Sequence, residues 1–88
     1  MLMFSVFDEK VGAFLPPMFM RSRGEAIRSF SAAVGSKDHQ FSMFPSDFVL
    51  YFLGEFNDQN GSFITVPTPE RLLKASDVVN PDNPVLAA

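Results

Sequence analysis

FDEKVGAFL at residues 7–15 and FNDQNGSFI at residues 56–64 are two versions of one pattern, placed 49 positions apart. In each, a phenylalanine precedes a polar turn that closes on glycine, and a small residue, a second phenylalanine and an aliphatic residue follow. Apolar runs on both sides of such a turn are typical of a β-hairpin, because glycine takes the positive φ angle that the last turn position needs. The sequence therefore predicts two hairpins, with strands at residues 3–7, 13–15, 48–56 and 62–66.

A helix is predicted directly after the first hairpin, over residues 23–34. Ser22 with Glu25 three residues later forms a capping box, and Gly35 is expected to be the C-cap. The apolar residues between these caps fall on one stripe at helical spacing; they are Ala26, Ile27, Phe30, Ala33 and Val34. Residues 36–47 are predicted to be loop.

The strand at residues 48–56 is apolar on both faces. Side chains alternate along a strand, so one face carries Phe48, Leu50, Phe52 and Phe56, and the other carries Val49, Tyr51, Leu53 and Glu55. In a two-layer antiparallel domain one face of the sheet is usually polar. The second face is therefore predicted to be covered, either by a second copy of the chain through an interface at Val49, Tyr51 and Leu53, or by the loop with its apolar residues Phe41, Met43 and Phe44.

A second, short helix is predicted after the second hairpin, with Thr68 as N-cap, Pro69 at its first position and its end near Ser76. The expected fold class is α+β: a four-stranded antiparallel sheet with two helices on one face and a core that includes Ile27, Phe30, Val34, Leu72 and Leu73. Two duplicated ββα units explain the repeat, but hairpins that close on glycine also resemble each other without duplication. Residues 1–79 are expected to form a single domain and residues 80–88 a flexible tail.

The composition narrows the function classes. The chain has 88 residues, no cysteine and a net charge of −3, and its pI is about 4.8. Without cysteine there are no disulfides and no thiol nucleophile, and neither a signal peptide nor a membrane span is recognisable, so a cytoplasmic location is expected. Proteins that neutralise many phosphates are normally basic, which argues against non-specific nucleic-acid binding by the whole surface.

No catalytic or metal-binding pattern stands out, and the chain is predicted not to be an enzyme and to need no cofactor or metal. His39 is the single histidine, and the carboxylates are scattered, mostly in turns. The basic residues nearest to a phosphate-site pattern are Arg21, Arg23 and Arg28, which lie at the start of the first predicted helix, where free backbone N–H groups attract anions. The alternative is that these arginines are simply solvated beside a capped helix.

Two longer patterns carry a family resemblance. Residues 5–19 are SVFDxKxGAFLPPxF, followed by AIRxF at residues 26–30, and residues 45–56 are PxDFxLYxLGEF, followed by Gly61 and Phe63. Over about residues 4–73 the chain resembles the small nonstructural protein of gokushoviruses, single-stranded DNA phages of the Microviridae.

The resemblance implies a role in the bacterial host cytoplasm. By analogy with the small switch protein of the coliphage microviruses, such a protein is absent from the mature virion and assists single-stranded genome replication and packaging. It is implied to bind DNA or phage replication and packaging proteins, and the apolar strand adds the expectation of a homo-oligomer. The alternative is a protein–protein interaction module that acts on host or capsid-assembly partners without nucleic-acid contact.

Overall fold

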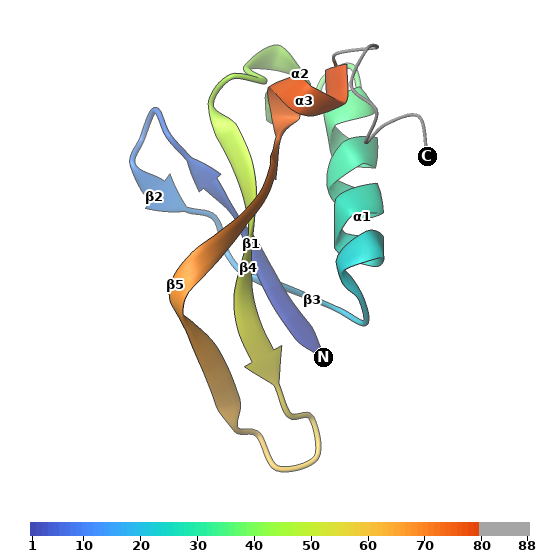
Figure 1. The fold of residues 1–88 in the computed structure, drawn as a ribbon. Helices are drawn as coiled ribbons and strands as arrows, with labels where there is room; N and C mark the ends of the chain where they lie inside the picture. Colours follow the sequence, from blue (N-terminus) through green and yellow to red (C-terminus); the bar gives the residue numbers. More distant parts are fainter. Residues whose placement is uncertain (80–88) are drawn as a thin grey trace.

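The computed structural model describes residues 1–79, which form an antiparallel sheet with helices on one of its faces (Figure 1). The fold class is α+β as predicted, but with five strands and three helices in place of four and two. The predicted tail at residues 80–88 lies outside the described residues. The elements are β1 (Leu2–Asp8), β2 (Ala13–Phe14), β3 (Met18–Met20), α1 (Arg23–Gly35), α2 (Gln40–Met43), β4 (Phe48–Phe56), β5 (Phe63–Lys74) and α3 (Ala75–Val79).

The sheet has β1 and β4 at its centre and all its pairs are antiparallel. β2 and β3 both pair with the same outer side of β1, and β5 pairs with the outer side of β4. β3 was not predicted. Pro16 and Pro17 separate it from β2, because proline has no N–H to donate to the sheet. The last hydrogen bond before them runs from the Leu15 N–H to the Val6 carbonyl, and pairing with β1 resumes at Met18.

Helix α1 begins as its capping residue predicts. The Ser22 side chain accepts a hydrogen bond from the Glu25 N–H at 3.1 Å. The end of the helix differs from the prediction: Gly35 is the last helical residue, and Ser36 is the C-cap, with a φ of −79° and an N–H that donates to the Ala33 carbonyl. Because no left-handed residue is needed there, Gly35 does not serve as the predicted glycine cap.

The core lies between α1 and the sheet. From the sheet it contains Phe4, Val6, Phe48, Leu50, Phe52 and Leu73, and from α1 it contains Ala26, Phe30 and Val34. The predicted core residues Phe30, Val34 and Leu73 are confirmed as buried, while Ile27 and Leu72 are partly buried and pack against the margin of the core.

The helix predicted from Pro69 is wrong, because β5 continues through this segment as far as Lys74. β5 is an edge strand and tolerates proline there. Glu70 lies opposite Phe52 and Lys74 lies opposite Val49, so pairing with β4 overrides the local helix signal. Helix α3 begins only at Ala75, one residue after the end of β5.

The segment between α1 and β4 contains α2, which was not predicted. Its N-cap is His39, whose Nδ1 accepts a hydrogen bond from the Phe41 N–H at 3.1 Å. The Phe41 ring is buried, 5.3 Å from the Phe30 ring and 4.7 Å from the Phe48 ring. Phe41 therefore packs on the helix side of the sheet, which contradicts the alternative that the loop with Phe41, Met43 and Phe44 covers the opposite face.

The two hairpin turns have the same geometry, as the repeated sequence predicts. Gly12 and Gly61 have φ angles of 79° and 76°. The Asp8 Oδ1 accepts hydrogen bonds from the N–H groups two and three residues later, and Asn57 Oδ1, 49 positions further on, does the same. The repeat is thus a repeat of structure in the turns, and the duplication of a whole ββα unit stays a prediction.

Candidate functional site

The face of the sheet opposite α1 is not covered by the described helices, and we call it the open face. Figure 1 shows the helices gathered on the other side of the sheet. Phe4, Leu50 and Phe52 point to the helices, so their neighbours along the strands point away. Through the strand register the strand residues on the open face include Met3, Ser5, Phe7, Phe14, Phe19, Val49, Tyr51, Phe56, Phe63, Thr65, Arg71 and Lys74.

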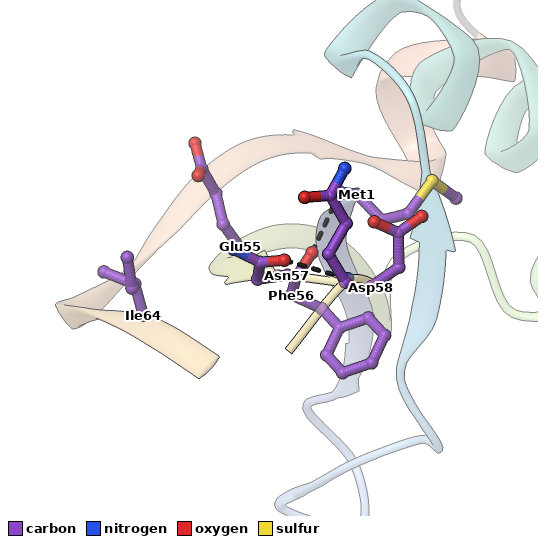
Figure 2. A pocket seen from close by; sticks show the side chains of 7 residues that line it. Met1, Glu55, Phe56, Asn57, Asp58 and Ile64 are labelled. Atoms are coloured by element: carbon purple, nitrogen blue, oxygen red, sulfur yellow. Dashed lines mark hydrogen bonds between the residues drawn. The ribbon is translucent and has the colours of Figure 1, made fainter. Parts of the chain in front are cut away.

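A β-bulge at Leu53 changes which side chains share a face. The β1–β4 register shifts between Met3 and Phe4, which leaves Leu53 without a partner on β1. Beyond the bulge the alternation is inverted, so the predicted facing of Phe56 with Phe48 is wrong and Phe56 lies on the open face. Figure 2 shows its ring directed away from Glu55 and Ile64.

Six aromatic side chains form two clusters on the open face. In the first aromatic cluster the Phe14 ring lies 4.8 Å from the Phe7 ring and 5.5 Å from the Tyr51 ring. In the second aromatic cluster the Phe56 ring lies 5.0 Å from Phe63 and 5.5 Å from Phe19. The exposed members are Phe14, Phe19 and Phe63, at 42%, 41% and 58% exposure.

Of the three predicted interface residues, Tyr51 belongs to the first aromatic cluster, whereas Val49 and Leu53 belong to neither cluster. Val49 lies on the open face but is only 1% exposed, and Tyr51 and Leu53 are half-buried. Sequence reasoning assigned no role to Phe14 or Phe63, the exposed residues of the two hairpins. The repeat was the signal that could have identified them, since it places both at the same position after the turn glycine.

Charges are sorted between the two faces of the sheet. The strand carboxylates Asp8, Glu55 and Glu70 lie on the helix-bearing face, opposite Phe48, Leu2 and Phe52 respectively. The charged strand residues of the open face are both cations. Arg71 Nη2 lies 3.8 Å from Asp77 Oδ2, and Lys74 Nζ lies 2.9 Å from Glu9 Oε1. These carboxylates come from α3 and from the β1–β2 turn, at the margin of the open face.

The three arginines near the start of α1 occupy different surroundings. Arg23 forms an ion pair with Glu70 and its guanidinium lies 4.4 Å from the centre of the Phe52 ring. All three arginines are exposed. Arg28 lies five positions after Arg23, which turns it about 140° around the helix, so these two side chains do not share a direction. The Arg23–Glu70 ion pair links α1 to β5. Arg28 lines a pocket of about 340 Å³ together with Ser22, Gly24 and Glu25.

A polar pocket of about 320 Å³ lies at the far end of β4 (Figure 2). The Met1 amino group donates a hydrogen bond to the Phe56 carbonyl at 3.0 Å beside it. Its carboxylates are Glu55 and Asp58. Within residues 1–79 no three His, Cys, Asp or Glu side chains come together as a metal site would require. In the same part of the chain no helix is long and apolar enough to cross a membrane.

Comparison with known proteins gives one result. A family model described as Phage ORF5 protein matches residues 1–78, which covers both hairpins and nearly all of the described structure. No curated protein and no solved structure matches the chain.

Proposed function

The chain belongs to the Phage ORF5 protein family, and from this membership and its open face we propose that it is a non-catalytic phage accessory protein that binds single-stranded DNA during genome replication and packaging. The sequence resemblance to the gokushovirus nonstructural protein points to the same role, in the cytoplasm of a bacterial host. The proposal needs no cofactor and no metal.

The observation that carries the proposal is the pair of exposed aromatic clusters on the open face. Base-on-ring stacking is worth about 1–3 kcal/mol per base and tolerates any sequence, because every base has a π-face. Sheets that present aromatic side chains bind two or three bases in this way in RNA-recognition modules. In a duplex the base faces are already stacked, so the open face suits a single strand better than a double strand.

Fluorescence anisotropy with a labelled oligonucleotide tests the proposal. We expect the protein to bind a single strand at low salt more tightly than the matching duplex. We also expect its affinity to fall as salt rises, because each contact between a cationic side chain and a phosphate releases a counterion. Equal affinity for both forms, or no binding of the single strand at low salt, would overturn the proposal.

A second candidate function is protein–protein interaction, including self-association. The β4–β5 hairpin supports it, since it projects beyond α1 (Figure 1) and carries Phe63 at 58% and Ile64 at 68% exposure. Phe63 lies on the open face and Ile64 on the other face of the hairpin, and exposed apolar side chains of this kind can mark an interaction surface. In this alternative a second copy of the chain, or a host or capsid-assembly protein, occupies the open face, and no nucleic acid is contacted.

A further inference from the structure

We propose that the open face holds two equivalent stacking subsites, one on each hairpin, so that a single chain holds unpaired bases at two separate places. This inference rests on the proposed function. It adds which residues contact the bases and how many short oligonucleotides one chain binds. The base-contacting rings are assigned to Phe14 in the first aromatic cluster and to Phe63 in the second.

The two hairpins present these rings in the same way. Phe7 and Phe14 are cross-strand partners with ring centres 4.8 Å apart, and Phe56 and Phe63 are cross-strand partners with ring centres 5.0 Å apart. Each pair directly flanks a turn that has the same hydrogen bonds and the same glycine conformation as the other turn. Phe14 and Phe63 are therefore equivalent in sequence, in pairing and in position on the sheet.

Each pair is completed by a third ring from another strand. Tyr51 of β4 lies 5.5 Å from Phe14, and Phe19 of β3 lies 5.5 Å from Phe56. Contacts of this kind hold rings in place, so an arriving base meets an ordered aromatic surface and little side-chain entropy is lost on binding. The outermost rings keep roughly half of their surface accessible.

The distribution of charge favours a polyanion over a second copy as the occupant. The charged strand residues of the open face are Arg71, opposite Tyr51 of the first aromatic cluster, and Lys74, opposite Val49. These cations form ion pairs with Asp77 and Glu9 at the margin of the open face. A phosphodiester backbone that follows the stacked bases offers them further anionic partners, whereas the open-face strand residues of a second copy include no carboxylate. The strand carboxylates lie on the helix-bearing face, away from the path of such a strand.

Binding by Phe14→Ala, Phe63→Ala and the double variant tests the two subsites. The controls are Phe44→Ala, which removes a ring of 54% exposure outside the open face, and Ile64→Ala, which removes an apolar side chain from the other face of the same hairpin. Each protein is titrated with a short oligonucleotide of about four nucleotides and a long one of about 16, the two ends of the range of site sizes known for single-strand binders.

We expect two short oligonucleotides to bind per wild-type chain and one to bind per single variant. A long oligonucleotide engages both subsites at once, so each single variant should lower its affinity about tenfold or more, and the double variant should lower it further. Both controls should bind like the wild type.

Other outcomes separate the failure of this inference from failure of the proposed function. If the wild type binds no single strand, both fail. If it binds, but only one of the two phenylalanines matters, or neither does, the proposed function stands and the paired subsites are refuted. If the variants lose self-association in sedimentation while the wild type binds no oligonucleotide, a second copy is the occupant and both proposals are overturned.

Discussion

Gly54 decides where the aromatic residues of the second hairpin point. It lies beside the unpaired Leu53, is buried, and has a φ of 146°, in a region that residues with a side chain rarely adopt. A Cβ atom at this position would lie 2.2 Å from the Ile64 carbonyl oxygen and 2.8 Å from the Thr65 Cα. β5 approaches the backbone of β4 this closely only because residue 54 has no side chain.

We expect Gly54→Ala to destabilise the protein by about 3 kcal/mol or more, since the backbone strain adds to a clash with backbone atoms that have little freedom to move. Urea unfolding followed by circular dichroism measures the change. Gly35→Ala is the control, because a Cβ there meets nothing within 4 Å and alanine favours the helix. A Gly54→Ala variant as stable as this control would mean that the bulge is not required.

The hairpin turns are the elements in which the repeat has a physical meaning. In each turn one side-chain oxygen, from Asp8 or from Asn57, accepts two backbone hydrogen bonds. Aspartate and asparagine offer the same oxygen in the same place. The two turns therefore use interchangeable residues, although their sequences differ.

Exchange of these residues tests the equivalence. We expect Asp8→Asn and Asn57→Asp to change the free energy of unfolding little, and the alanine variants at both positions to lose about 1 kcal/mol each. The measurement is urea unfolding of the four variants under the same conditions. A turn that tolerates alanine but not the exchange would show that the side-chain oxygen is not what closes it.

Docking of α1 depends on Phe30, whose buried ring packs against Phe41 of α2. We expect Phe30→Ala to cost about 3–5 kcal/mol, because a cavity remains in the core; for a chain this short that is a large share of the whole stability. Thermal unfolding decides the point, with Phe44→Ala as the matched control in which an exposed ring is removed. Retention of the melting transition by Phe30→Ala would contradict the observed core.

Sequence reasoning succeeded where structure is set by neighbouring residues. The cap at Ser22 and both glycine turns are local features, and they appear as predicted. Pairing across the sheet is not local, so the Thr68-Pro69 helix signal gave way to the strand β5. The same holds for the candidate site: the alternation rule gave the facing of Val49 and Tyr51, but the bulge at Leu53 inverted it for Phe56. A glycine within a strand pattern signals such a bulge, and Gly54 was that signal.

At the scale of the whole molecule, the proposed single-strand binding and the predicted self-association would use the same open face. We therefore expect oligonucleotide binding to exclude self-association. Sedimentation at micromolar concentration, without and with a saturating oligonucleotide, measures this: any dimer of the 9.8 kDa chain should be converted to a complex of one chain with DNA. A dimer that persists with DNA bound would place the two partners on different surfaces, and a monomer under both conditions would refute the predicted oligomer.

The salt dependence of binding distinguishes two sets of cations. Each phosphate contact with a single strand contributes about −0.7 to the slope of log K against log salt. The sequence pointed to the exposed arginines at the start of α1, of which Arg23 is paired with Glu70, whereas the open face carries Arg71 and Lys74. Two double variants test these sets: Arg21→Gln/Arg28→Gln and Arg71→Gln/Lys74→Gln. Each removes two positive charges, so a difference between their salt slopes reports the position of the cations and not the total charge.

We expect the slope to flatten by up to about 1.4 in the open-face variant and by less in the α1 variant, because stacked bases hold the backbone beside Arg71 and Lys74. Asp77 and Glu9 lie within 4 Å of Arg71 and Lys74 respectively. Because these carboxylates compete with phosphate for the two cations, we expect the change in slope to be smaller than about 1.4. Greater flattening in the α1 variant would place the phosphates at the helix N-terminus and remove the DNA backbone from the open face. The aromatic clusters would then have no anionic strand beside them, and a protein partner would be the better explanation of the uncovered sheet.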